Sequence, residues 1–449
     1  MPLPMSLVYQ CEKLNAFNTN TVRIEPQGLN TASAGGSTIT FNLPINDVIN
    51  MKSFRVFSDV TLTGTCARLP DFHHLIQKVS VYAGSVLLNS GSQMWNVMYA
   101  AKQALVEKYA DPLAHSEFVR SVKYLDGSAI AGTDPEVIPN ALCWSNWETT
   151  FMGTCKPQYI FTGVLPEMRI VIETAPNAVL TSSASSVLSA AGFLTAAASP
   201  NATYSLSNMF ANIEVMSFND GSYEQMINTV LSEAPLEICY KNFHSYNDLH
   251  NGATTFSINS QSLDAIHFTF RASTYATQGA PVRVAGKKSS GAFVAGTSGG
   301  SPNVEIGLPS GTDVGGVYGC SSEGYTPKYL TFAAPSSNFK ANIGINGYTY
   351  PLQMSSLPEL FEVTKNSLHK PLRKDLTYNQ YLTNYFVNTV RFAFPEDPSG
   401  RSVSGINTAD SNMAGRIQTE NATNVYCTVL GETTQLLRVG GNRVIDVIE

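Results

Sequence analysis

The chain has 449 residues and a net charge of −6, and only 14% of its residues are charged while 43% are hydrophobic. The acidic balance and the scarcity of charge give no support to binding along a phosphate backbone. The two short basic clusters, 287–288 and 369–374, are interpreted as solvated loops. The length predicts two or three domains, and the abundance of uncharged polar residues is typical of β-rich chains whose surfaces pack against neighbours.

Seven cysteines are scattered along the chain without a C-x-x-C pair, and their odd number argues against a complete disulfide framework. We therefore expect a reducing compartment, in which most of them act as small core residues. The first fifteen residues lack the basic and long apolar regions of a secretion signal. No window approaches the 18 apolar residues that a membrane-spanning helix requires.

The first half of the chain opens with an irregular segment, residues 1–30, which suits an N-terminal arm that becomes ordered against something else. Alternating apolar residues and β-branched runs then predict strands at 38–43, 53–62, 75–81, 86–88, 144–152, 158–162, 168–173 and 204–218. Helical spacing predicts helices at 92–109 and 223–233, and residues 111–145 are interpreted mostly as loop.

The second half repeats the same kind of pattern. It predicts strands at 236–243, 254–258, 266–271, 329–332, 341–345, 348–352, 385–394, 414–418, 424–430 and 436–448. Between them lies a Gly- and Ser-rich tract at about 273–325. A tract this long without evident secondary structure is usually a functional or exposed loop.

One unit occurs twice. Residues 339–369 read as a strand, an Asn-Gly turn at Asn346-Gly347, a second strand and a helix beginning near Ser355, with Pro358 in its first turn. Residues 77–109 show the same order, and aligning Gly84 with Gly347 pairs the two turns and the two helices. The sequence therefore predicts a duplicated domain.

Together these patterns predict a mainly β fold of two consecutive eight-stranded jelly-roll sandwiches, each with an inserted short helix and long surface loops. The predicted division is an arm over 1–30, a first jelly roll over 31–222, a linker helix over 223–235 and a second jelly roll over 236–449.

Candidate catalytic and metal-binding patterns all have simpler interpretations. Gly296–Gly300 matches the G-x-S-x-G nucleophile elbow, but it lies in the Gly/Ser tract and not between a strand and a helix. His73 and His74 are adjacent and would face opposite sides of a strand, so turn or capping roles are favoured. His244 and His250 enclose Asp248, but no second cluster completes a metal site.

The remaining candidates are an acidic pair in a Pro-flanked turn, interpreted as solvated, and three tryptophans, interpreted as core or interface residues: Glu396, Asp397, Trp95, Trp144 and Trp147. The sequence therefore predicts no catalytic residue, no cofactor and no metal site. We expect the protein not to be an enzyme.

The order of segments resembles the double jelly-roll major capsid proteins of icosahedral double-stranded DNA viruses, the lineage that includes adenovirus hexon, large DNA viruses and virophages. The resemblance is carried by five segments: 74–88 (HLIQKVSVYAGSVLL), 165–173 (LPEMRIVIE), 262–271 (SLDAIHFTFR), 343–352 before its helix, and 436–448 (LLRVGGNRVIDVI).

That resemblance implies a structural protein of the virion, in which three copies form a pseudo-hexagonal capsomer and capsomers tile a shell. The implied partners are further copies of the chain, neighbouring capsomers, penton and minor capsid proteins and, in some relatives, an underlying membrane, without direct contact to nucleic acid. Assembly inside the host cell, without secretion through a signal peptide, is expected. Residues 291–319 are predicted to form part of an outward-facing loop.

Two alternatives remain open at this stage. One is a carbohydrate-binding or carbohydrate-cleaving β-sandwich protein, which a secretion signal or a paired-carboxylate site would support. The other is a single-jelly-roll shell protein of a small virus with an elaborate projecting domain.

Overall fold

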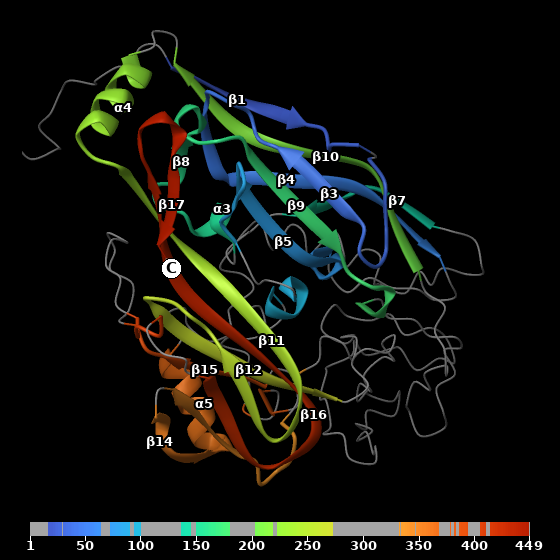
Figure 1. Cartoon of the computed structure of the whole chain (residues 1–449). Helices are drawn as coiled ribbons and strands as arrows, with labels where there is room; N and C mark the ends of the chain where they lie inside the picture. Colours follow the sequence, from blue (N-terminus) through green and yellow to red (C-terminus); the bar gives the residue numbers. More distant parts are fainter. Residues whose placement is uncertain are drawn as a thin grey trace, which may run out of the picture.

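The computed structural model of the chain consists of two β lobes, with strands up to Phe218 in the first and strands from Leu236 onward in the second (Figure 1). The structure describes residues 17–28, 30–63, 72–89, 94–99, 136–144, 150–179, 203–218, 222–272, 332, 334–345, 347–367, 378, 381–382, 386–393, 405–409 and 414–448. The predicted mainly β fold class is confirmed, because strands dominate the described residues and the helices are short.

The first lobe contains two antiparallel sheets. One has the order β1-β10-β4-β7, with β2 on β10 and β8 on β4, and the other has the order β3-β9-β5-β6. Their bounds are β1 Phe17–Ile24, β2 Ala32–Ser33, β3 Thr38–Asn42, β4 Val48–Thr63, β5 Ile76–Ala83, β6 Val86–Leu87, β7 Glu136–Trp144, β8 Tyr159–Phe161, β9 Met168–Thr174 and β10 Thr203–Phe218.

The two sheets of the first lobe face each other across an apolar core. In β9, alternate side chains are buried, which is the pattern of a strand with one face inside. Phe41 of β3 meets Phe54 of β4 edge to face at 5.9 Å, so the contact joins one sheet to the other. This arrangement is a β-sandwich.

The second lobe is a single connected sheet built around β16, Ala414–Val439. The strand order is β14-β13-β16-β12-β15, with β11 and β17 also paired to β16. The bounds of these strands are β11 Leu236–Ser257, β12 Leu263–Ala272, β13 Lys340–Ile345, β14 Tyr348–Ser356, β15 Val387–Arg391 and β17 Ile445–Ile448.

This sheet folds over on itself and so forms both layers of a sandwich. β13 pairs with one end of β16 and β12 with its middle, so the two neighbours diverge from the same strand. The β11–β16 pairing shifts register on both sides of Asn251, and Gly252 and Asn421 there have positive φ values of 89° and 61°.

Aromatic contacts show that the two branches face each other. Phe270 of β12 meets Phe339, which directly precedes β13, at 5.2 Å. Phe339 also meets Phe386, which directly precedes β15, at 5.5 Å. All three side chains are buried, so they form an aromatic centre of the second core.

The duplicated hairpin and helix are both present. β5 and β6 enclose the turn with Gly84, β13 and β14 enclose the turn with Gly347, and both glycines have positive φ. Residues 95–99 are helical after the first hairpin, and α5, Leu357–Ser367, follows the second. Glu359, in the first turn of α5, accepts hydrogen bonds from the N–H and the hydroxyl of Ser356, at 2.6 and 2.8 Å, which is the carboxylate half of a capping box.

The alignment of Gly84 with Gly347 is off by one residue. Ala83 pairs with Val86, so Gly84 is the first of two turn residues. Ile345 pairs with Tyr348, so Gly347 is the second. Aligning by turn position instead places Trp95, the first described helical residue of its unit, opposite Leu357, the first residue of α5.

Several local predictions are wrong. Residues 17–24 of the predicted irregular arm form β1, which pairs with β10 along its whole length. Phe151–Thr154 is a helical turn, α3, and not part of a strand. Residues 136–144, within the predicted loop 111–145, form β7. The separate strands predicted at 236–243 and 254–258 are one strand, β11. The strands predicted at 414–418 and 424–430 and the first part of the strand predicted at 436–448 are one strand, β16, and the rest of 436–448 forms a 3-10 helix and β17.

The helix α4, Ser222–Glu233, confirms the helix predicted between the two halves. The Gly/Ser tract 273–325 lies outside the described residues, as do most of the predicted helix 92–109 and most of the strand 329–332.

Candidate assembly surface and the junction between lobes

Two of the first-lobe candidates, His73 and Trp95, lie in its core. His73 lies in a 3-10 helix, Phe72–Leu75, and stacks on Tyr99 with ring centroids 4.4 Å apart. Trp95 stacks on the same tyrosine at 5.2 Å. All three side chains are buried, so their role is packing. The His74 side chain is outside the described residues.

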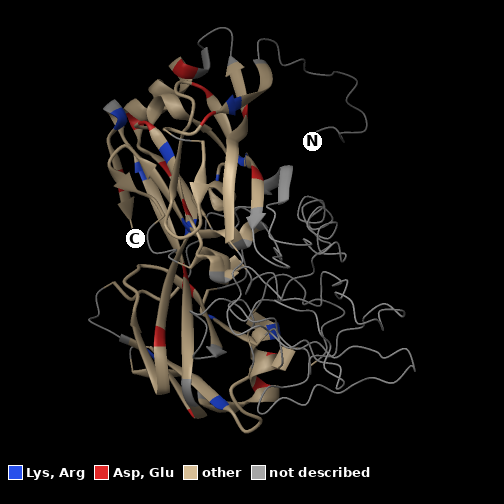
Figure 2. Ribbon diagram, turned by 90° about the vertical axis from the view of Figure 1, so that its right-hand side faces the viewer, with Lys and Arg blue, Asp and Glu red and all other residues tan. Residues whose placement is uncertain are grey.

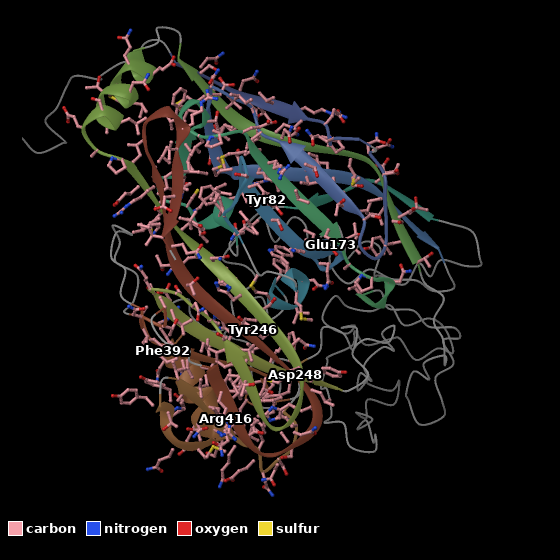
Figure 3. All side chains as sticks on the ribbon, in the orientation of Figure 1. Tyr82, Glu173, Tyr246, Asp248, Phe392 and Arg416 are labelled. Carbon is pink, nitrogen blue, oxygen red and sulfur yellow. The ribbon has the colours of Figure 1, made fainter. Side chains whose placement is uncertain are left out.

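His250 of β11 links β11 to β16 where the sheet of the second lobe bends. Its Nδ1 lies 2.6 Å from the Thr254 hydroxyl and its Nε2 lies 2.6 Å from the Thr419 hydroxyl. Burial lowers the pKa of His250, while the charge of Asp248, two residues earlier on β11 (Figure 3), acts in the opposite direction. Burial also lowers the pKa of His244. Both histidines are therefore neutral side chains of the fold near pH 7.

Within the described parts of the chain, no group of three or more His, Cys, Asp or Glu residues is arranged to hold a metal ion. The Cys155 thiol is buried, and desolvation raises its pKa to about 12, the mark of an inert core cysteine. Gly296–Gly300, Glu396 and Asp397 lie outside the described residues, as do Trp147 and the side chain of Trp144.

A buried charged cluster joins three strands of the second lobe. Lys241 of β11 forms a salt bridge with Asp264 of β12, whose side chain is 1% exposed, and its Nζ donates to the Thr434 hydroxyl of β16 at 2.8 Å. The Ser262 hydroxyl also donates to Asp264, at 2.9 Å. Glu432 lies 3.9 Å from the Lys241 ammonium. Because Lys241, Asp264 and Thr434 come from three different strands, the cluster fixes the register of all three.

The junction between the lobes is formed by the first residues of β11 packing on the first lobe. Tyr240 meets Phe151 of α3 edge to face at 5.0 Å, and its hydroxyl donates to the Leu88 carbonyl at 2.9 Å. Asn89 donates to the Asn242 amide oxygen at 3.3 Å and accepts the Phe151 N–H at 2.6 Å.

Backbone pairing continues across the junction. Lys156 and Cys239 exchange two backbone hydrogen bonds, at 2.8 and 3.2 Å. The Lys241 N–H donates to the Thr154 hydroxyl at 3.1 Å. The edge of β11 is thus covered by the first lobe, and Figure 1 shows α3 lying beside it. The two lobes are therefore held in a fixed relative orientation.

The described surface carries little charge. Figure 2 shows Lys, Arg, Asp and Glu scattered singly over both lobes, without a large field of one sign. Salt bridges such as Arg438–Glu237, at 2.9 Å, lie between half-exposed side chains and contribute about 0–1 kcal/mol. No helix in the described part of the chain is long and apolar enough to cross a membrane.

The two-sandwich arrangement defines the double jelly-roll class of fold. Solved structures share it over nearly the whole chain. VP54 of PBCV-1, fitted into a reconstruction of the virophage Sputnik, matches with a TM-score of 0.54 and 11% identity over 99% of both chains. The Faustovirus major capsid protein matches with a TM-score of 0.54 and 9% identity over 97% of this chain and 92% of its own.

The Sputnik virophage structure, determined by cryo-EM, matches with a TM-score of 0.50 and 9% identity over 100% of this chain and 92% of its own. No protein-family model matches the sequence, and no curated protein matches it either. The chain therefore has the double jelly-roll fold of these viral proteins, and the fold class and the resemblance predicted from the sequence are confirmed.

The sequence reasoning missed the charged cluster and the junction. A signal for the cluster exists, because Asp264 and Lys241 each interrupt an apolar strand, and a charge in a buried strand is rare unless it is paired. The junction residues carry no comparable signal, since Tyr240, Asn242 and Asn89 are ordinary strand and turn residues.

Proposed function

We propose that this protein is a structural major capsid protein whose trimer forms a pseudo-hexagonal capsomer of an icosahedral virus shell. The observation that carries the proposal is the match of the whole chain, both sandwiches included, to viral capsid structures. The match to proteins of this class favours capsid assembly over the carbohydrate-acting alternative.

The composition supports burial against neighbours. Interface cores are depleted of charged residues, and the chain has only 14% charged residues. The low charge of the described surface (Figure 2) is consistent with a protein that packs side by side with its own copies.

The unequal exposure of the two duplicated hairpins supports a trimer. Val86 in the first hairpin packs against the hydrophobic core, whereas the matching Tyr348 in the second is 70% exposed. Directly after the first hairpin, Leu88 and Asn89 contact the second lobe through Tyr240 and Asn242. In a ring of three chains every lobe has a lobe on each side, so the second hairpin would meet the first lobe of the next chain.

Native mass measurement tests this proposal. We expect an assembly three times the 48.5 kDa chain mass. Tyr348→Ser should weaken that trimer, while Val444→Ser, a matched change at a side chain that is 65% exposed far from the hairpin, should leave it intact. A stable monomer that binds or cleaves a glycan would contradict the capsid proposal.

The finer features belong to the same proposal. The proposed partners are further copies of the chain, neighbouring capsomers, penton and minor capsid proteins and an underlying membrane, with no direct contact to nucleic acid. The protein is proposed to be located in the virion without acting as an enzyme. The division at 1–30, 31–222, 223–235 and 236–449 is kept as the domain proposal, with β1 added to the first sandwich.

Residues 291–319 are proposed to face outward, so a protease should cut them in assembled particles. Protection of that loop would count against its outward placement.

A further inference from the structure

The charged cluster of the second lobe places an amine against a carboxyl group in a buried site. Lys241 of β11 is in hydrogen-bond contact with Asp264 of β12 through its Nζ atom and the Asp264 Oδ2 atom. The Asp264 side chain is 1% exposed and that of Lys241 is 19% exposed, so little water reaches the contact. A nitrogen that touches one carboxyl oxygen lies about 3–3.5 Å from the carboxyl carbon, which is the separation of two groups arranged to react.

The backbone holds this pair in place from both sides. β16 lies between β11 and β12, and Lys241 pairs with Thr434 in the β11–β16 ladder. The pairing of β12 with β16 shifts register between Leu263 and Ala265, so Asp264 is the extra residue of a β-bulge. A bulge turns a side chain out of the usual alternation. The contact between Lys241 and Asp264 therefore crosses one face of β16 and is fixed by strand pairing at both ends.

Hydroxyl groups hold both oxygens of the Asp264 carboxyl group. The Ser262 hydroxyl donates to Oδ1 at 2.9 Å, and the Thr434 hydroxyl donates to Oδ2 at 2.5 Å. The Ser262 hydroxyl in turn accepts the Gly405 N–H at 3.0 Å. A Cβ at Gly405 would lie 2.7 Å from Oδ1, so glycine lets the backbone approach the carboxyl group this closely. Fixed donors of this kind stabilise the negative charge that develops on a carboxyl oxygen when a nucleophile adds to the carbon.

A second carboxyl group lies close enough to carry protons. Glu432 Oε1 is 3.9 Å from Lys241 Nζ, and Glu432 Oε2 is 3.6 Å from Nε2 of His267. The Nδ1 atom of the same histidine is 2.8 Å from the Thr389 hydroxyl. A lysine must lose a proton before its nitrogen can attack, and a carboxylate beside that nitrogen can accept the proton. Nucleophile, electrophile and proton acceptor are therefore side by side.

We propose that Lys241 and Asp264 condense to form an isopeptide bond, with Glu432 as the proton carrier. The Lys241 nitrogen bonds to the Asp264 carboxyl carbon and gives up two protons. Both protons reach Oδ2 by way of Glu432, the bond between the carboxyl carbon and Oδ2 breaks, and Oδ2 leaves as one molecule of water. One C–N bond replaces one C–O bond, nothing is oxidised or reduced, and Glu432 ends in the protonation state in which it began.

Orientation supplies the driving force for this condensation. A free amine and a free carboxylic acid do not condense in dilute solution, but groups held in a fixed arrangement react as though present at up to about 10⁵–10⁸ M. The salt bridge is the state from which the reaction starts, and the product joins β11 to β12 across β16. The proposal concerns the single folded chain, so a failed trimer measurement would leave it unchanged.

The mass of the intact, denatured chain tests the bond. We expect the purified full-length protein to be lighter than its sequence mass by one molecule of water. A protease digest should contain a branched peptide in which Lys241 is joined to Asp264. A chain at its full sequence mass, with Lys241 in a linear peptide, would overturn the proposal. Lys340 is the internal control, because it forms an exposed salt bridge with Glu420 at 3.3 Å and should stay in a linear peptide.

Two variants assign the roles of the side chains. Lys241→Arg keeps a positive charge next to Asp264 but has no amine to condense, so it should have its full sequence mass. Glu432→Gln keeps the size of the side chain but cannot accept the proton, so the cross-linked fraction at a fixed time should fall about tenfold or more. A water loss that persists in Lys241→Arg would refute Lys241 as the nucleophile, and cross-linking of Glu432→Gln at the parent rate would refute Glu432 as the proton carrier.

Discussion

The two lobes have one architecture but are stabilised differently. The first lobe stacks two separate sheets over an apolar core, in which Phe41, Phe54 and Trp95 are fully buried. The second folds one continuous sheet over itself. Among the described residues, the buried carboxylates, Asp264 and Glu432, both lie in this second lobe.

This difference shows how one sandwich can be closed in two ways. A continuous sheet needs groups that specify where it bends and which strands pair, and paired polar groups supply that specificity at the cost of desolvation. His250 lies at the bend and the Lys241–Asp264 salt bridge lies across three strands. The second lobe is therefore expected to be the more sensitive of the two to charge and pH.

The largest expected effect comes from breaking the charged cluster. Asp264→Ala removes the nearest carboxylate from the Lys241 ammonium and leaves Glu432 at 3.9 Å, so we expect a loss of about 3–5 kcal/mol in the free energy of unfolding. The double variant Lys241→Met with Asp264→Leu removes both charges and should cost less than the single variant. Denaturant unfolding measures both. A single variant as stable as the parent protein would show that the cluster does not hold the second lobe.

The two turn glycines give a direct comparison of the duplicated units. Alanine at either position is strained by the positive φ, at a cost of about 1–2 kcal/mol. At Gly84 the added Cβ would also lie 2.9 Å from the Pro166 side chain, whereas at Gly347 it would meet nothing within 4 Å. Overpacking adds about 1–3 kcal/mol at the first site. Thermal unfolding should therefore rank Gly84→Ala well below Gly347→Ala, and equal melting temperatures would contradict the ranking.

The pH dependence tests the bend. Burial lowers the pKa of His250 and His244, so the unfolded chain binds protons that the folded chain does not. The resulting stability is present above the unfolded pKa of about 6.5 and is lost as pH falls below it. His250→Gln should reduce the change in the free energy of unfolding with pH. It should also lower the free energy of unfolding near pH 7 by about 1 kcal/mol, because the hydrogen bonds to Thr254 and Thr419 are altered. If the free energy of unfolding changed with pH between 7 and 5 in the same way as it does in the parent protein, His250 would not be a source of the pH dependence.

The smallest effect concerns thiol reactivity. Cys155 is buried with its pKa raised to about 12, whereas Cys239 at the junction is partly exposed. In the native protein, alkylation followed by peptide mass spectrometry should modify Cys239 before Cys155. Unfolding in denaturant should abolish the difference, which serves as the control. Faster labelling of Cys155 would show that the first core opens more readily than the junction.

Local features could be predicted from the sequence because their causes are local. The hairpins follow from the glycines at Gly84 and Gly347, and α5 follows from its apolar spacing and its cap at Ser356. Even here the register was wrong by one, because the sequence does not say whether a glycine is the first or the second turn residue.

Long-range features could not be predicted. β11 and β16 each read as separate strands because Gly252 and Asn421 interrupt the pattern, yet pairing continues past these bulges. β1, FNTNTVRI, is a polar edge strand without clear alternation, and its identity depends on pairing with β10, about 190 residues later. The exposure of Met226 and Val230 depends on which side of α4 meets the lobe, and helical spacing alone does not give it.

The place of β16 in the chain has a consequence for biosynthesis. Every strand of the first lobe has been made by Phe218, so that sandwich can close while the ribosome is still translating the rest. The second lobe has its central strand, which pairs with β11, β12, β13 and β17, almost at the end of the chain. Before residues 414–439 emerge, β12 can pair with β15 and β13 with β14, but β11 has no partner among the described strands and one edge of β12 and of β13 is left open to aggregation. Translation of these residues therefore sets the earliest moment at which a complete subunit exists.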